Sequence, residues 1–134
     1  MKLWVIPADR MKAKREHVVP LSKQALEILE VMRPISANRQ YVFPSRNDSK
    51  QPMNSQTVNA ALKRIGYDGK LVAHGLRSIA STTLNEAGFN PDVIEAALAH
   101  SDKNEVRRAY NRSTYLDQRK ELMEWWGNKV YSKP

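Results

Sequence analysis

The sequence predicts a mainly helical α+β domain that carries a small antiparallel β-hairpin at its front. Apolar residues recur at helical spacing in several segments after residue 22, and a glycine or proline stands where most of these segments end. Before residue 21, two short apolar runs enclose a polar stretch, which is typical of a hairpin. With 134 residues, the chain has the length of one ordinary domain with a single core.

The first predicted element is the hairpin, formed by residues 3–6 and 17–19. Pro7 ends the first apolar run and Pro20 the second, and the stretch between them is polar and basic. The first strand is apolar and has nothing before it, as if it came from the inside of a domain. We therefore expect the fold to be truncated at its N-terminal side.

The predicted helices follow from caps and from periodic apolar residues. Ser22 is a suitable N-cap for the first helix, and Pro34 is expected to end it. Residues 41–43 are expected to form a short strand or extended piece before a polar loop. Later helices end at glycines in the left-handed cap position or begin at Asn90-Pro91. They are expected at residues 55–65, 76–87, 91–98 and 116–128, with a further helical turn or two at 106–110.

The charge of the chain favours a polyanionic partner. Lysine and arginine number 22 against 14 acidic residues, which gives a net charge of +8 and a pI near 9.9. Each cation placed on a nucleic-acid phosphate releases condensed counterions, although charge alone is equally compatible with a solvated basic surface. The absence of cysteine excludes disulfides, thiolate metal sites and thiol catalysis, and no apolar run approaches the ~20 residues of a membrane span.

Four residues, in chain order, have the chemistry that phosphoryl transfer needs. His74 and Arg77 share one face at the start of a predicted helix, where they and free backbone N–H groups could hold a phosphate. Alone, this pair is better explained by a satisfied histidine and a surface arginine. His100 follows 23 residues after Arg77, and Tyr110 follows ten residues after His100 in a basic stretch. Together they supply an attacking hydroxyl, cations for the non-bridging oxygens and proton donors.

This order of residues resembles the signature of the tyrosine recombinases, which include the phage integrases. The signature is His-x-x-Arg, then Leu-x-His about two dozen residues later, then Tyr some ten residues after that. The resemblance covers nearly the whole chain, and in detail it is similar to the satellite-phage P4-like branch of prophage integrases. The matching segments are residues 6–8, 10–12, 17–22, 73–77, 84–86, 88–95, 98–100, 106–112 and Trp125-Trp126.

The resemblance implies a mainly helical catalytic core and a role for each signature residue. Tyr110 would attack the scissile phosphate, form a 3′-phosphotyrosine link and release a 5′-hydroxyl. Arg77 would hold the non-bridging oxygens, and His100 would bind a phosphate oxygen. His74 would act near the tyrosine hydroxyl as a general base or hydrogen-bond partner. This chemistry needs no metal and no cofactor.

The resemblance also implies that a hairpin lysine protonates the leaving 5′-oxygen. Lys12 lies eight residues before Pro20, as the family spacing requires, and Lys14 is its competitor. The family's first catalytic arginine lies well before this lysine on an earlier helix, whereas Arg10 lies on the hairpin itself. Residues 1–134 are therefore expected to be the C-terminal part of the catalytic domain and to be catalytically poor as an isolated chain.

Several aromatic and basic residues have two interpretations each. Tyr115 is a rival nucleophile, but it is expected to pack or to cap the last helix. At least one of Trp125 and Trp126 is expected to fill the core rather than to stack on a base, and the resemblance also implies a share in contact with a neighbouring protomer. The basic residues Arg107-Arg108, Arg112 and Arg119-Lys120 are explained equally well as DNA-facing or as solvated. If they face DNA, Arg107, Arg108 and Arg112, together with Lys63 and Arg64, are the candidates for phosphate contacts, which position an enzyme rather than read sequence.

The partners follow from the resemblance as well. They are double-stranded DNA attachment sites, a homo-tetramer on that DNA, an excisionase and a host DNA-bending protein, in a bacterial cytoplasm at the nucleoid and with no membrane. Two other functions stay open: a DNA-binding remnant without catalysis, which would not need Tyr110, and a type IB topoisomerase, which makes the same bond as a monomer. A divalent-metal nuclease is a third, and a chelator would inhibit it.

Overall fold

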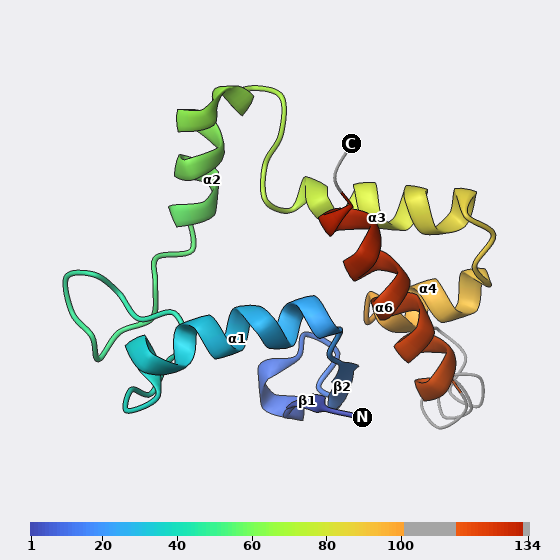
Figure 1. Cartoon of the computed structure of the whole chain (residues 1–134), viewed down its shortest axis with the longest axis horizontal. Coiled ribbons are helices and arrows are strands. Elements are labelled where there is room, and N and C mark those ends of the chain that lie inside the picture. The colour runs from blue at the N-terminus through green and yellow to red at the C-terminus, as the bar shows by residue number, and fades with distance from the viewer. Residues whose placement is uncertain (101–114, 133–134) are drawn as a thin grey trace. The chain divides into compact units, whose positions relative to one another are not determined.

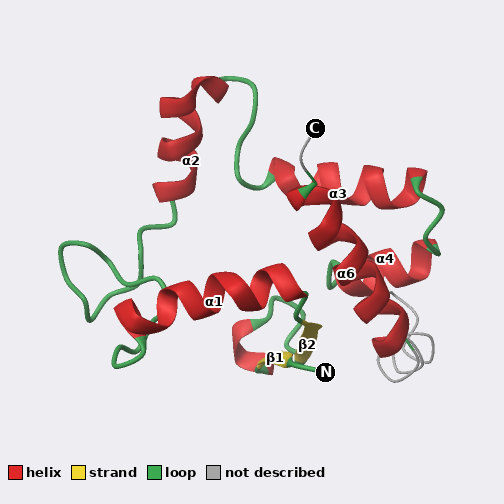
Figure 2. Cartoon of the chain, in the orientation of Figure 1, coloured by secondary structure: helices red, strands yellow, loops and turns green. Residues whose placement is uncertain are grey.

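The computed structural model of the chain describes residues 1–100 and 115–132. The described residues are mostly helical and contain one antiparallel pair of strands, as the sequence predicts (Figures 1 and 2). They fall into two compact units, one of residues 1–25 with those from 80 onwards, and one of residues 26–79. The elements are β1 (Leu3–Ile6), η1 (Ala8–Arg10), β2 (His17–Pro20), α1 (Lys23–Ser36), α2 (Thr57–Leu62), η2 (Lys63–Tyr67), α3 (Gly75–Glu86), α4 (Pro91–Ala97) and α6 (Leu116–Tyr131).

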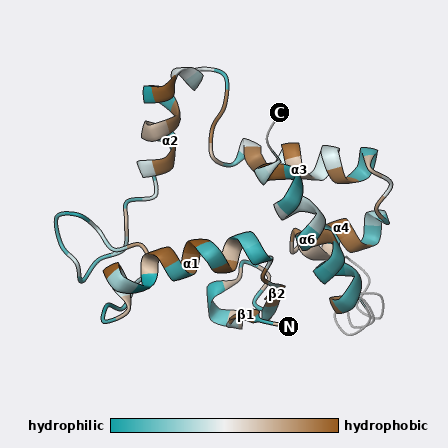
Figure 3. Cartoon of the chain, in the orientation of Figure 1, coloured by the Kyte–Doolittle hydropathy of each residue, from teal (hydrophilic) through white to brown (hydrophobic). Residues whose placement is uncertain are grey.

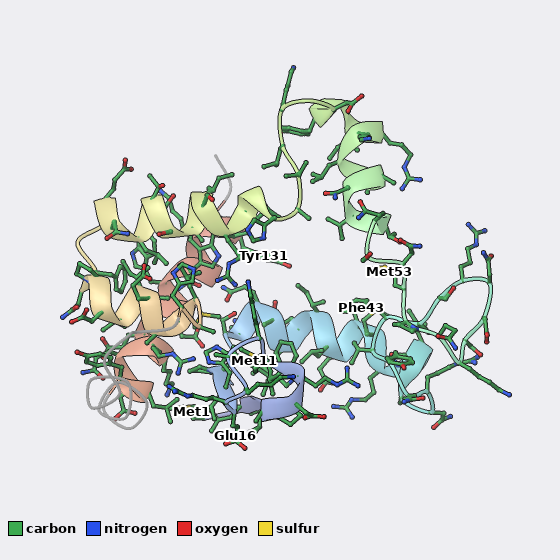
Figure 4. All side chains as sticks on the ribbon, turned by 180° about the vertical axis from the view of Figure 1, so that it is seen from behind. Met1, Met11, Glu16, Phe43, Met53 and Tyr131 are labelled. Atoms are coloured by element: carbon green, nitrogen blue, oxygen red, sulfur yellow. The ribbon has the colours of Figure 1, made fainter. Side chains whose placement is uncertain are left out.

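The hairpin forms where the sequence predicts it. β1 and β2 pair antiparallel, with Leu3 opposite Pro20 and Ile6 opposite His17. The connection between them begins with the single 3₁₀ turn of η1 and continues through a further turn, in which the amide of Lys14 donates to the carbonyl of Met11 at 3.0 Å. Figure 4 labels Met11 in this connection. The connection is therefore a folded turn rather than a loose loop.

The core of the first unit lies between α3, α4 and α6. Its buried residues are Leu84, Val93, Ile94 and Leu122. Figure 1 shows α4 and α6 packed side by side, and Figure 3 shows that α4 is largely apolar. Phe89 meets Trp125 edge to face, with ring centroids 5.3 Å apart. Trp125 and Trp126 are both partly buried against this core, which confirms that the tryptophans contribute to it.

The capping residues in the sequence predict the start of α4 correctly. Gly88 takes the left-handed conformation after α3, with a φ of 88°, as a residue without a Cβ does readily. The side chain of Asn90 then accepts a hydrogen bond from the amide of Asp92 at 2.8 Å, and Pro91 occupies the first helical position. These three predictions from the sequence are confirmed.

Helix α6 is joined to the hairpin by a buried arginine. Arg119 is only 5% exposed, and its Nη2 donates to the carbonyl oxygen of Val18 in β2 at 2.5 Å. Its Nε has no hydrogen-bond partner among the described residues. Burial also lowers the pKa of Arg119, because desolvation disfavours the charged form. Both sequence interpretations of Arg119, as DNA-facing or solvated, are therefore wrong.

The start of α1 is also attached to α6. The amide of Lys23 donates to Oε1 of Glu124 at 3.2 Å, and Nε2 of Gln24 donates to Oδ1 of Asn128 at 2.6 Å. Ser22 caps the helix as predicted, because its hydroxyl accepts from the amide of Ala25 at 3.3 Å. The front of the chain is thus held to its last helix by contacts about a hundred residues apart in sequence.

We expect Arg119→Met to lower the free energy of unfolding of this unit by about 1–3 kcal/mol, because the partly buried carbonyl of Val18 loses the donor that Arg119 supplies. All three tryptophans, at positions 4, 125 and 126, lie in this unit, so tryptophan fluorescence during urea titration reports its unfolding. Lys120→Met, at the exposed neighbouring position, is the control. Equal urea midpoints for the two variants would contradict a structural role for Arg119.

Two predictions about the second unit are wrong. Pro34 does not end α1, which continues to Ser36. The helix tolerates this proline in its last turn because the amide of Ala37 still bonds the carbonyl of Arg33 at 3.0 Å, and the Ser36 hydroxyl bonds that of Met32 at 3.2 Å. Of the two alternatives for residues 41–43, a strand or an extended piece, the strand is wrong, and the loop that follows closes through one isolated bridge between Pro44 and Pro52.

The chemistry of this loop explains why no strand forms. Both residues of the bridge are prolines, which have no N–H to donate to a strand ladder. The amide of Met53 bonds the carbonyl of Phe43 at 2.8 Å, and Figure 4 labels both residues where the two arms of the loop meet. The pairing therefore closes a loop but does not extend into a sheet.

The predicted helix at residues 55–65 is shorter and less regular than expected. α2 covers Thr57–Leu62 and continues into the wider π-helical turn Lys63–Tyr67. Gly66 in that turn has a φ of 99°, the left-handed conformation that its sequence position predicts. The helical turn predicted at 106–110 lies outside the described residues. No helix in the part of the chain that the structure describes is long and apolar enough to cross a membrane.

Candidate active site

His74 and Arg77 lie together at the start of α3. His74 directly precedes the helix, Arg77 is in its first turn, and both side chains are exposed. A separation of three residues places them on neighbouring positions of the helix surface. Both belong to the unit of residues 26–79. The structure thus confirms that the two side chains begin a helix and are accessible to a ligand.

The backbone amides beside this pair are engaged, contrary to the sequence interpretation. The amide of Gly75 donates to the carbonyl of Val72 at 2.9 Å, and that of Leu76 to the carbonyl of Ala73 at 3.2 Å. The amide of Arg77 donates to the carbonyl of His74 at 3.2 Å. These turn bonds occupy the N–H groups that usually donate hydrogen bonds to an anion at a helix start. The side chains, rather than these amides, are the groups that could bind a phosphate.

Asn59 holds the segment in front of His74 in place, a role that the sequence analysis missed. Its Oδ1, on α2, accepts a hydrogen bond from the amide of Ala73 at 2.7 Å. Gly75 leaves little room for a side chain at the next position, because a Cβ there would lie 3.3 Å from Cδ1 of Leu71. An asparagine inside a helix could have indicated such a bond, because its amide side chain competes for backbone groups. Nothing local in the sequence identifies Ala73, fourteen residues away, as the partner.

Lys12 lies in the connection between β1 and β2, as predicted, and its side chain is exposed. Lys14 lies in the same connection, is also exposed and has a φ of 54°, a left-handed conformation that is uncommon for a residue with a side chain. The structure therefore places both candidates on the same turn. The preference for Lys12 stays a prediction from spacing.

His100 directly follows the turn that ends α4. Its Nδ1 lies 2.5 Å from Oε2 of Glu95, and its backbone amide donates to the carbonyl of Glu95 at 3.0 Å. The two side chains are about half exposed, at 49% and 52%. Glu95 is a second residue that the sequence analysis missed. The spacing of five residues alone does not indicate this contact, because the carboxylate reaches the histidine only when the helix ends in a left-handed turn between them.

The remaining predicted site residues divide into two sets. Tyr110, Arg107, Arg108 and Arg112 lie outside the described residues. Lys63 and Arg64 are exposed in the π-helical turn after α2. Tyr115, the rival nucleophile, is partly buried, packs against the core and stands at the N-cap position of α6. This placement of Tyr115 agrees with the predicted packing role.

The described site residues belong to two different units. His74, Arg77, Lys63 and Arg64 are in residues 26–79, whereas Lys12 and His100 are in the unit that contains the hairpin, α4 and α6. Within the described ranges 1–100 and 115–132, no three His, Cys, Asp or Glu side chains cluster as ligands for a metal ion would. Each unit therefore presents exposed cationic or imidazole groups by itself.

The sequence is similar to known integrases over almost its whole length. The model of the phage integrase family matches residues 1–117. The prophage integrase IntA of Escherichia coli strain K12 is 69% identical over 127 residues, which cover 95% of this chain and 31% of that protein. The integrase of Enterobacteria phage P4 is 41% identical over 142 residues, covering 94% of this chain and 32% of that protein.

A third relative gives the same result. The integrase of Shigella phage Sf6 is 40% identical over 136 residues, covering 98% of this chain and 34% of that protein. The chain thus spans about a third of the length of the curated relatives that it matches. No solved structure matches the chain.

Proposed function

Because this chain belongs to the phage integrase family, we propose that residues 1–134 form the C-terminal part of the catalytic domain of a site-specific DNA recombinase. The observation that carries the proposal is the exposure of His74, Arg77 and His100 beside helix ends, in the chain order of the family signature. Side chains in such positions can meet a DNA phosphate without disturbing the core. The family match over residues 1–117 also spans the positions of Lys12 and Tyr110.

In the proposed reaction, the hydroxyl of Tyr110 attacks the scissile phosphate in line. A bond forms between the tyrosine oxygen and phosphorus, and the bond to the 5′-oxygen breaks, with Lys12 donating a proton to that leaving oxygen. His74 assists at the tyrosine hydroxyl, while Arg77 and His100 hold the non-bridging oxygens. Because the pentavalent transition state carries extra negative charge, these groups stabilise it more than the ground state. The reverse attack by a 5′-hydroxyl rejoins the DNA, so no external energy source is needed.

The proposed partner is double-stranded DNA, and the net charge of +8 supports it. We assign Arg107, Arg108, Arg112, Lys63 and Arg64 to phosphate contacts. The integrase relatives support attachment-site DNA as the substrate, for integration and excision of a mobile element. A tetramer on DNA, an excisionase, a host DNA-bending protein and association with the bacterial nucleoid complete the proposal. The names of these relatives favour an integrase over a binding remnant or a topoisomerase.

The 134 residues alone are expected to cleave slowly. The family's first catalytic arginine precedes the hairpin lysine, and Arg10 on the hairpin connection does not take its place. Losing one group that stabilises the transition state costs on the order of 10²–10³ in rate. We therefore expect covalent adduct to form about that much more slowly with this chain than with the full-length prophage integrase of Escherichia coli that is 69% identical to it.

A nicked duplex that carries the attachment site of that relative tests both statements. The nick lets the short 5′-hydroxyl strand diffuse away, so the adduct accumulates and is counted on a denaturing gel. Mass spectrometry of the DNA-linked peptide should identify Tyr110, and a chelator should leave the rate unchanged. Equal rates for the two proteins would contradict the slow cleavage, and an adduct at Tyr115 would contradict the assigned nucleophile. A reaction that the chelator stops would favour a divalent-metal nuclease.

A further inference from the structure

Glu95 is fixed in space by the core face of its helix. Helix α4 is anchored by Val93 and Ile94, which are 4% and 0% exposed. Glu95 is the next residue, on the exposed side of the helix. Its backbone therefore cannot shift without disturbing the best-buried part of this unit. This rigidity makes Glu95 a suitable support for a neighbouring functional group.

The end of α4 returns the chain to Glu95. Leu98 is the C-cap, and Ala99 takes a left-handed conformation with a φ of 56°. The amide of Ala99 donates to the carbonyl of Ala96 at 3.2 Å, and that of His100 to the carbonyl of Glu95 at 3.0 Å. These two bonds define the cap in which the chain reverses directly after a helix. An alanine in this conformation is costly, which indicates that the turn is held in place by its surroundings.

The same turn brings the two side chains together. Nδ1 of His100 lies 2.5 Å from Oε2 of Glu95, so one residue holds the histidine by both backbone and side chain. An ionised carboxylate only accepts hydrogen bonds, so this contact requires the proton on Nδ1. Nε2 is then the ring nitrogen left for another partner. A phosphate oxygen can accept a hydrogen bond from Nε2 when the ring carries both protons.

We propose that Glu95 is a positioning residue for His100: its carboxylate accepts from Nδ1–H and leaves Nε2 to face a DNA phosphate oxygen, to which Nε2 donates when the ring is protonated. The contact with a DNA phosphate rests on the proposed recombinase function, whereas the hydrogen bond between Glu95 and Nδ1 of His100 does not. Both side chains are about half exposed, so their contact contributes little to the stability of the fold. Loss of Glu95 should therefore change the state of the histidine ring and the reaction rate, but not the folding of the chain.

Nuclear magnetic resonance of the ¹⁵N-histidine-labelled chain tests the tautomer directly. In the neutral form of the ring, we expect His100 to carry its proton on Nδ1, the nitrogen that faces Glu95. Glu95→Gln should keep this tautomer, because the amide oxygen still accepts. Glu95→Ala should shift the proton to Nε2, the site that unbound histidine prefers. The control Glu86→Ala, at the exposed end of α3, should change nothing. A proton on Nε2 in the unchanged chain would overturn the proposal.

The rate of covalent adduct formation gives the functional test. For histidines that bind a metal, removing the hydrogen-bond partner that orients the ring lowers metal affinity or activity roughly 10–100-fold. We expect Glu95→Ala to lower the rate of adduct formation by a similar factor. Glu95→Gln should retain most of the rate. In a His100→Ala background, Glu95→Ala should cause no further loss, since its effect acts through the ring. A full further loss in that background would contradict positioning. Absence of adduct from the unchanged chain and from its full-length relative would count against the recombinase function, while the tautomer measurement would still decide the role of Glu95.

Discussion

Replacing Tyr110 with phenylalanine is expected to abolish the covalent DNA adduct and to leave DNA binding unchanged. Phenylalanine keeps the ring but has no oxygen to attack the phosphate, so the first bond of the proposed reaction cannot form. Removing the nucleophile of an enzyme of this covalent kind lowers the rate by on the order of 10⁶-fold, which is below detection on a denaturing gel. The binding of DNA depends instead on the basic surface, which this substitution does not alter.

The measurement pairs the denaturing-gel assay with an electrophoretic mobility shift at one fixed salt concentration. Tyr115→Phe is the matched control, because Tyr115 is the nearest tyrosine and packs against the core at the start of α6. The control should form adduct at close to the unchanged rate. Adduct in Tyr110→Phe but not in Tyr115→Phe would reverse the assignment. If the unchanged chain shifts DNA but forms no adduct, and its full-length relative forms none either, the chain is better described as a binding module.

Local sequence signals predict the elements of this fold well where a cap or a turn decides the outcome. Ser22, Gly88 and Asn90 each take the predicted role, because a short polar side chain or a missing Cβ acts within three residues. The prediction of the hairpin is also confirmed, since two short apolar runs, each followed by a proline, enclose a polar stretch. Pro34 shows the limit of such rules. A proline normally stops a helix, but near the end of α1 the following residues still satisfy the carbonyls.

The candidate site is harder to predict from the sequence, because the contacts that hold its residues in place are long-range or depend on the backbone conformation. The order of His74, Arg77 and His100 predicts their chemistry, but it does not show that the amides beside His74 are already bonded. The burial of Arg119 depends on β2, about a hundred residues earlier in the chain, so a basic run in the sequence gives no indication of it. The Glu95–His100 contact depends on the left-handed turn between them, which an alanine does not predict.

The largest structural effect is expected from Ile94→Ala, which should lower the free energy of unfolding of its unit by about 2–5 kcal/mol. Ile94 is 0% exposed and packs in the core with Leu84 and Leu122, so truncation leaves a cavity between α3, α4 and α6. Urea titration followed by tryptophan fluorescence measures the change in this unit, because all three tryptophans belong to it. Val130→Ala on α6, where the side chain is 57% exposed, should change the free energy by no more than about 0.5 kcal/mol.

The same substitution separates support of the site from direct participation in it. Because Ile94 is buried in the core and makes no phosphate contact of its own in the proposed reaction, its loss should reduce adduct formation only as far as the folded fraction falls. Adding a low urea concentration to the unchanged chain until its folded fraction matches should then give the same rate. A much lower rate in Ile94→Ala at matched folded fraction would mean that the α4 core also sets the geometry of the Glu95–His100 pair. A stability loss below about 1 kcal/mol would show that α4 and α6 do not share the tightly packed core described above.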